Sequence, residues 1–391
     1  VFQVTSALVG LRDAPLISLN LGSTEALSPD RWQSLSEHAE RLQTALKTVG
    51  DPTTHFFRMV QRHDLPPAEE TSLPQRFEAL RISAAGLRDA TSVARTALGL
   101  GALPDDRRGT ELLVELADLL ATAPGVTTTL LQEPSWKAFR NDVDEWASHG
   151  RERQEDWEAL APTWNEALLG LPLENLRARF TRWGQAFFLI AFLMLWGARR
   201  TLKTAATSGR LPKNREMVAT LERALRVQAN DRFLAGIQED GQRLFARQWK
   251  GKETDWSRVV GTVDWAGRFR SALAELSEIA PDLGAAREHL LTLATVDVER
   301  ATGPGALARD IRLLATAHRN FNDAKADLLR DLRIDETSAW AGLEGPGFPQ
   351  AMVDRCDRWK AALPTLRNWL HYLRVCEATR DAGLGDLVSA E

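Results

Sequence analysis

Apolar residues recur at spacings of three and four along nearly the whole chain, and this pattern constrains the fold most strongly. It is the period of an amphipathic α-helix, whereas the alternation typical of a half-buried strand is nearly absent. Only residues 1–20 could hide a strand. Helix start and stop signals punctuate the pattern, as at Ser28-Pro29 before one periodic segment and Gly50 after it. The sequence therefore predicts an all-α protein, built as an elongated multi-helix bundle.

The longest periodic segments predict a long antiparallel, coiled-coil-like hairpin. One helix is expected from Leu173 to about Thr207 and a return helix over residues 213–248, joined by a short loop. The apolar seam of the first helix comprises Leu176, Phe180, Trp183, Phe187, Ile190 and Met194. Residues 188, 189, 192, 193, 195 and 196 are apolar too. We therefore expect other helices to surround this part of the chain.

This hairpin divides the chain into three predicted segments. An N-terminal helical bundle is expected over residues 1–170 and the hairpin over residues 171–250. A C-terminal bundle over residues 251–391 is expected to pack back on the first. The 391 residues, with 44% apolar content, are ample for a large core.

Composition narrows the functional classes. The formal net charge of −4 argues against a protein that coats nucleic acid through its overall charge. Cys356 and Cys376 do not form a disulfide framework, which favours a reducing, cytoplasmic setting. The chain begins with Val1 and shows no signal peptide, so we expect a piece of a longer reading frame. The apolar run 186–196 is about half the ~20 residues that span a bilayer; a buried helix is favoured over a membrane-surface contact, and no membrane partner is expected.

No pattern of residues predicts catalysis in this chain. There is no phosphate-binding loop, no HExxH, no CxxC and no EF-hand loop. His289 and His318 are single histidines on helices, and His55 and His63 lie eight residues apart without converging ligands. The sequence therefore predicts a non-enzymatic chain with no metal site and no cofactor of its own.

A block without acidic residues, from Asn175 to Arg215, is the main candidate for a binding surface. Its cations are expected to contact phosphates without reading sequence. The candidate nucleic-acid contacts are Arg199, Arg200, Lys203, Arg210, Lys213 and Arg215. The alternative is that these side chains compensate a helix dipole and pair with Glu216, Glu222 or neighbouring helices.

The stretch from Trp249 to Trp265 predicts a structural joint between two helices. Gly251 is suited to the left-handed conformation that ends a helix. Thr254 is expected to cap the next helix, with Asp255 in its first turn. Trp249 and Trp256 are expected to bracket the turn as packing anchors.

Four segments in order resemble the helical region inserted in large bacterial superfamily 1 helicase–nuclease fusions of the phage-defence type. They are VGDPTTHFFRMVQRHDLPPAEE at 49–70, LWGARRTLK at 195–203, FARQWKGKETDW at 245–256 and LPTLRNWLHYLRVCEATRDAGLGDLV at 363–388. Phe56-Phe57 departs from the family, which often has a proline and an aromatic residue after the histidine. The resemblance implies that the ATP-binding loop lies upstream of this region and the magnesium-holding acidic motif downstream.

The resemblance implies a non-catalytic accessory domain of an ATP-dependent DNA helicase-like protein. Such a domain would brace the motor and contact nucleic acid, with the rest of the parent chain as its partner and with ATP and Mg bound elsewhere in that parent. No catalytic residue carries over to this chain. The alternative function is a structural or protein-interaction coiled-coil arm with no role in nucleic-acid binding, marked by an exposed apolar patch.

Overall fold

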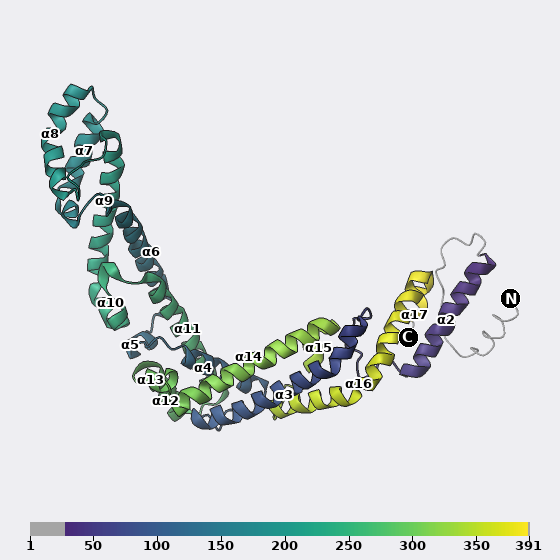
Figure 1. Cartoon of the computed structure of the whole chain (residues 1–391). Coiled ribbons are helices and arrows are strands. Elements are labelled where there is room, and N and C mark those ends of the chain that lie inside the picture. Colours follow the sequence, from purple (N-terminus) through teal and green to yellow (C-terminus); the bar gives the residue numbers. More distant parts are fainter. Residues whose placement is uncertain (1–27, 390–391) are drawn as a thin grey trace. The chain divides into compact units, whose positions relative to one another are not determined.

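The computed structural model describes residues 28–389 and is helical throughout, as the periodicity predicts (Figure 1). No β-strand occurs in this range; Trp164 and Ala206 form an isolated bridge. The segment 1–20, where a strand was considered, lies outside the described residues. The chain divides into two compact units, one of residues up to 97 with 101–114 and 312 onwards, the other of 98–100 and 115–311. These two units are defined by how compactly their residues pack. The three predicted segments, with boundaries at residues 170 and 250, stay a prediction.

The first unit is built on two long helices, α3 and α16, with α2 packed against α16. Phe57, Phe77 and Trp359 meet edge-on in its core, and each is only 1% exposed. The described helices that belong wholly to this unit are α2 (Pro29–Val49), α3 (Pro67–Ala97), α15 (Glu336–Trp340), α16 (Phe348–Thr379) and α17 (Gly385–Ser389). Two further helices, α4 (Arg107–Ala121) and α14 (Ala306–Leu332), have residues in both units.

In the C-terminal part, α16 contains Pro364 in its interior and runs through this proline without a break. An interior proline removes one backbone hydrogen bond from a helix, and α16 packs against both α2 and α3. Leu366 and Trp369, just beyond the proline, are both buried and hold the helix in place.

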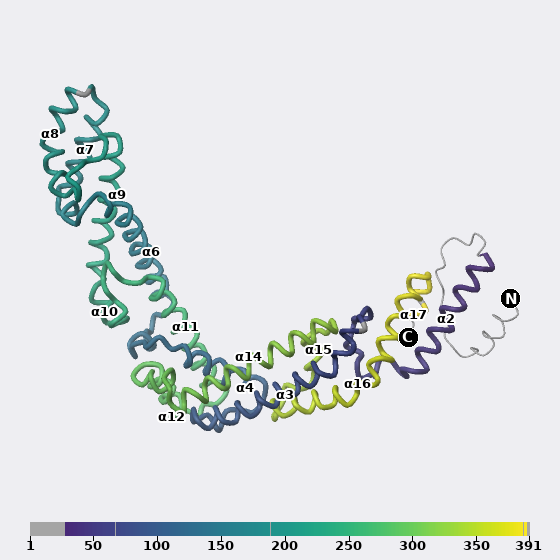
Figure 2. The backbone as a smooth tube through the Cα atoms, viewed as in Figure 1, coloured from purple at the N-terminus to yellow at the C-terminus, as the bar shows by residue number. Residues whose placement is uncertain are grey.

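The second unit holds the segment predicted to be the hairpin. Its described helices are α5 (Thr128–Leu131), α6 (Trp136–Leu160), α7 (Leu173–Trp183), α8 (Phe188–Ala205), α9 (Asn214–Gly236), α10 (Gln238–Phe245), α11 (Trp256–Ile279), α12 (Gly284–Thr295) and α13 (Val298–Thr302). Short 3-10 turns lie at Glu166–Gly170, Ala246–Gln248 and Gly251–Glu253. In Figure 2, α6 and α9 run side by side along this unit, and α7 and α8 lie at one end of that pair.

The prediction of one continuous helix from Leu173 to about Thr207 is wrong. The helix ends at Trp183, and α8 starts at Phe188. Gly184 donates its backbone N–H to the Phe180 carbonyl as the C-cap of α7. A Cβ at this glycine would lie 2.5 Å from the same oxygen, so a residue with a side chain fits poorly at the break. The return helix is also divided, at Ile237 between α9 and α10.

The helix that pairs along most of α9 is α6. The Arg226 guanidinium donates to Asp156 through Nε and Nη2 at 2.7 and 2.8 Å, and Arg153 Nε donates to Asp231 at 2.9 Å. His149 contacts Asn230 at 2.8 Å. His149 on α6 contacts Asn230, whereas Asp156, later on α6, pairs with Arg226, earlier on α9, so the two helices are antiparallel. The long hairpin between residues 173–207 and 213–248 is therefore not confirmed, although α7 packs on the first part of α9.

Candidate functional site

A large apolar face of α8 is exposed in this structure. Its side chains are 40–75% exposed: Phe187, Leu189, Ile190, Phe192, Leu193, Met194 and Trp196. The opposite side of the helix is buried in the core shared with α7 and α9, through Ala191, Leu195, Ala198, Leu202 and Ala205. At about 100° per residue, the exposed apolar side chains of α8 cover about half of the helix circumference. The face is a convex ridge, larger than scattered single apolar residues on a surface.

The expectation that other helices surround this segment is wrong for most of it. Leu189, Phe192, Leu193 and Trp196 are exposed, whereas Leu195 is buried. The side chain of Phe188 is outside the described set. The predicted seam fails for the same reason: Leu176 and Phe180 are buried, but Ile190 and Met194 are not. The break at residues 184–187 resets the helical phase, so that a different set of residues faces the core beyond it.

The six predicted cations lie at the far end of α8 and just after it. Arg199 Nη1 donates to Asn214 Oδ1 at 2.5 Å, which ties the end of α8 to the start of α9. The Arg200 guanidinium lies 5.8 Å from the centre of the Trp196 ring, at the edge of the apolar ridge. Arg199 is partly buried, and the other five cations are exposed: Arg200, Lys203, Arg210, Lys213 and Arg215.

No salt bridge joins any of these six cations to an acidic side chain within residues 28–389, so the alternative pairing with Glu216 or Glu222 does not occur there. The block 175–215 contains nine Arg and Lys and no Asp or Glu. Arg177 of this block pairs with Glu174, just outside it, whereas the charge of the six candidate cations is left for solvent or for a partner. The structure brings these cations and the apolar ridge together on neighbouring parts of the second unit.

The joint after α10 is a packed turn. Trp249 and Trp256 meet edge-on, with ring centres 5.4 Å apart, and both are buried. Gly251 adopts φ +58°, the left-handed conformation predicted for it, although it follows a 3-10 turn instead of ending one long helix. The capping residue was misplaced by one position. Asp255 is the N-cap of α11, where its carboxylate accepts from the Arg258 N–H at 3.0 Å. Thr254 is fully buried and accepts from the Lys250 N–H instead.

Each of the two tryptophans lies flat against a glycine. A Cβ on Gly241 would lie 2.3 Å from the Trp249 ring, and a Cβ on Gly150 would lie 1.9 Å from the Trp256 ring. Trp249 Nε1 also donates to Gln238 Oε1 at 2.8 Å. The joint thus fixes α6, α10 and α11 to one another through close ring–backbone contacts.

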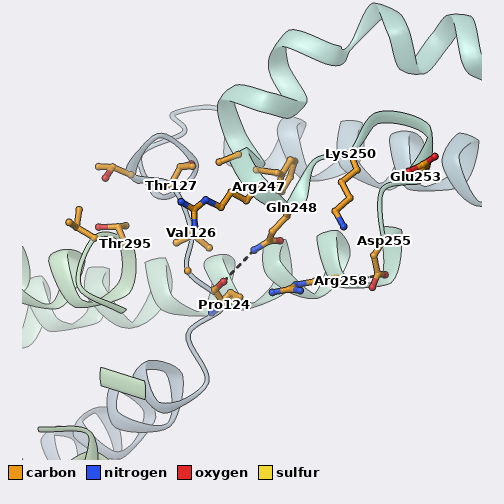
Figure 3. Close-up of a pocket in the computed structure, with 15 residues that line it drawn as sticks. Pro124, Val126, Thr127, Arg247, Gln248, Lys250, Glu253, Asp255, Arg258 and Thr295 are labelled. Atoms are coloured by element: carbon orange, nitrogen blue, oxygen red, sulfur yellow. Dashed lines mark hydrogen bonds between the residues drawn. The ribbon is translucent and has the colours of Figure 1, made fainter. Parts of the chain in front are cut away.

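A cavity of about 730 Å³ lies beside this joint (Figure 3). One wall is the loop from Pro124 to Thr128, and another is the turn from Phe245 to Lys250. Three cationic side chains line it: Arg247, Lys250 and Arg258. Sequence reasoning treated this stretch as a structural joint and missed these cations. Arg247 and Lys250 lie within the segment FARQWKGKETDW at 245–256, and their closeness in the sequence is the signal that could have pointed to them.

Three further features were considered as functional sites: groups of metal ligands, membrane-spanning helices and the loop histidine His55. Within residues 28–389, no group of three or more His, Cys, Asp or Glu side chains gathers as metal ligands. None of the described helices is both long and apolar enough to cross a membrane. His55 stacks on Trp369 with ring centres 4.6 Å apart, and its partial burial lowers its pKa. His55 thus has a packing role.

No protein-family model, curated protein or solved structure matches this chain. Two surfaces of the second unit are the candidate functional sites: the α7–α8 end and the cavity beside the joint.

Proposed function

We propose that this chain is a non-catalytic helical accessory domain of an ATP-dependent DNA-processing protein, and that it contacts nucleic acid through the block 175–215. The observation that carries the proposal is the charge of this block, nine cations and no carboxylate. The resemblance described above supports the parentage. ATP and Mg are then bound by other parts of that parent protein, and this chain supplies positioning.

The cations are arranged for contact with a polyanion. Arg200 and Lys203 lie on the exposed side of α8, Arg210 and Lys213 lie in the connection to α9, and Arg215 lies in the first turn of α9. Because none of them is neutralised by a carboxylate in the described chain, binding to phosphates loses no internal ion pair. Each phosphate that is neutralised releases condensed counterions, which makes the affinity strongly salt-dependent. Exposed Phe192 and Trp196 provide flat surfaces on which unpaired bases can stack.

The test is a salt titration of oligonucleotide binding, with single-stranded and duplex DNA. For Arg200→Glu/Lys203→Glu we expect affinity to fall at least about tenfold and the slope of log K against log salt to become shallower by about two, since each lost phosphate contact reduces it by about one. The matched control is Lys137→Glu/Arg287→Glu. These two side chains are exposed, lie in the same unit and make the same change in net charge. Equal losses in both double variants, or no binding by the unchanged protein, contradict the proposal.

The exposed ridge on α8 favours a second candidate function, a docking arm for another protein. Seven large apolar side chains on one helix exceed what a surface without a partner normally shows. A second copy of this chain is a poor occupant, because it would bring two acid-free cationic blocks together. Charge complementarity instead indicates a protein surface with an apolar centre and an acidic rim, and the remainder of the proposed parent protein is the occupant that we assign.

Co-expression with the polypeptide encoded by the flanking reading frame tests this second candidate. We expect a one-to-one complex that Phe192→Ser/Leu193→Ser abolishes, while oligonucleotide binding by this variant keeps its salt slope. The chain alone is expected to sediment as a monomer. Self-association through the ridge, or binding of the ridge to phosphatidylserine vesicles, would assign a different occupant and contradict the candidate.

A further inference from the structure

We propose that the cavity beside the joint is a binding site for a small phosphorylated molecule, with Arg247, Lys250 and Arg258 as the groups that hold its phosphates. This goes beyond the nucleic-acid contact proposed for the block 175–215, because the two sites share no residue. The cavity lies wholly within the second unit. Its volume of about 730 Å³ is in the range of pockets that bind nucleotide-sized ligands, roughly 300–1,000 Å³.

The charge balance of the cavity favours an anion. None of the three cationic side chains forms a salt bridge within the described part of the chain. Two carboxylates, Glu253 and Asp255, also line the cavity, so three cations and two carboxylates leave the lining a formal charge of +1. Asp255 accepts the Arg258 backbone N–H as the cap of α11. The Glu253 side chain lies at the edge of the view in Figure 3 and points away from Lys250 and Arg258.

The three cations reach the cavity from different pieces of backbone. Arg247 lies in the turn after α10, Lys250 follows it, and Arg258 belongs to the first turn of α11. In Figure 3 the Arg247 guanidinium points towards Val126 and Thr127, and the Lys250 and Arg258 side chains lie on the other side of Gln248. Cations that are spaced along the cavity in this way suit an elongated anion such as a pyrophosphate or triphosphate group, because each guanidinium or ammonium can donate to a different oxygen.

The walls of the cavity are held in place by hydrogen bonds. Gln248 donates to the Pro124 carbonyl at 3.4 Å and accepts from the Thr262 hydroxyl at 2.9 Å. Thr127 donates its hydroxyl to the Leu244 carbonyl at 2.7 Å, which ties the opposite loop to the end of α10. Ala246 has φ +45°, a conformation that side-chain-bearing residues rarely adopt. This backbone turn directly precedes Arg247 in the wall of the cavity.

Part of the remaining lining is apolar and suits the non-phosphate part of a ligand. Val296 is 79% exposed, and Pro124, Val126 and Phe245 also line the cavity. The other uncharged side chains of the lining are polar: Thr127, Thr128, Gln248 and Thr295. We therefore infer a ligand that joins a pyrophosphate group to a flat or apolar moiety, as a nucleoside diphosphate or triphosphate does. Inorganic phosphate alone is expected to bind more weakly, because it engages the cations but leaves the apolar wall uncovered.

Isothermal titration with inorganic phosphate, pyrophosphate and ATP tests the proposal on the whole chain. We expect affinity to increase in that order, and Arg247→Gln/Lys250→Gln/Arg258→Gln to weaken pyrophosphate and ATP binding at least tenfold. The matched control is Arg243→Gln, an exposed arginine on α10 that is paired with Asp240 and lies outside the cavity lining. Far-UV circular dichroism checks that the triple variant keeps its helices.

The result separates this site from the block 175–215. The triple variant is expected to keep its oligonucleotide affinity, and Arg200→Glu/Lys203→Glu is expected to keep its pyrophosphate affinity. Absence of binding by any of the three ligands at millimolar concentration overturns the proposal. The proposal is also overturned if Arg243→Gln weakens binding as much as the triple variant does, because the cations of the cavity would then have no special role.

Discussion

Replacing Gly150 by alanine tests the packing of the joint most directly. Gly150 lies inside α6, directly under the ring of Trp256, which is 1% exposed. A Cβ there would lie 1.9, 2.1 and 2.4 Å from three ring atoms, whereas carbon atoms in contact normally stay about 3.5–4 Å apart. The rigid indole must therefore move by about 1.5 Å within a filled core. Such overpacking costs about 1–3 kcal/mol of stability. Because the Trp256 indole is rigid and fully buried, we expect a cost near the upper end of this range.

The same substitution also removes a glycine from a helix, which stabilises by about 1 kcal/mol. Subtracting this gain from about 3 kcal/mol leaves a net loss of about 2 kcal/mol for Gly150→Ala. The matched control is Gly261→Ala in α11, because Gly261 is exposed and a Cβ there meets no atom within 4 Å. This control is expected to stabilise the protein by up to about 1 kcal/mol.

Urea denaturation followed by far-UV circular dichroism measures both variants. The two should differ by about 3 kcal/mol in the free energy of unfolding, with opposite signs relative to the unchanged protein. Gly150→Ala should also cost less when Trp256 is already replaced by leucine, because the residues in contact are coupled. If Gly150→Ala proves as stable as Gly261→Ala, the close seating of Trp256 on α6 is refuted.

Three further predictions concern capping and ionisation. Asp255→Ala should lower the free energy of unfolding by about 1 kcal/mol because α11 loses its N-cap. Asp255→Asn should retain most of this stability, because asparagine also caps helices. Equal losses in the two variants contradict the capping role. Hydrogen bonds from Arg81 and Lys360 lower the pKa of Glu78 from 4.5 to about 2. Its contribution to stability is therefore complete above about pH 4.5 and is lost as the pH falls towards about 2, so Glu78→Gln should flatten the acid limb of a pH–stability curve. Burial raises the pKa of the Cys356 thiol to about 12, so native protein should resist alkylation of this residue at pH 8 and urea-unfolded protein should not; mass spectrometry of the modified peptide decides.

Much of the local structure was predictable from the residues themselves. The all-α fold follows from the spacing of apolar side chains, and the first described helix begins at Pro29 after the Ser28 cap and ends before Gly50, as predicted. The two tryptophans of the joint also meet as expected. These features depend on neighbours within a turn or two, whose effect is nearly independent of the rest of the fold. Even here, capping moved from Thr254 to Asp255, because the Thr254 side chain is used inside the turn.

The candidate sites were less accessible to prediction. The six cations were identified from the absence of acidic residues around them, a property of sequence alone. The three cations of the cavity were missed, since Arg247 and Lys250 line one cavity with Arg258 only through the turn at Ala246 and the packing of Trp249. That arrangement depends on backbone angles that no spacing of residues reveals.

The sequence by itself determined that this chain is helical, where several helices begin and end, and that residues 175–215 carry only positive charge. The tertiary structure decided which helix pairs with α9 and which face of α8 is left exposed. The physical reason is the interruption at residues 184–187. A continuous helix would keep Ile190 and Met194 in phase with Leu176 and Phe180, but the turn after Gly184 rotates the following helix and directs Ala191 and Leu195 into the core instead. Periodicity is a local signal, whereas the choice between two apolar faces of one helix depends on what packs against it.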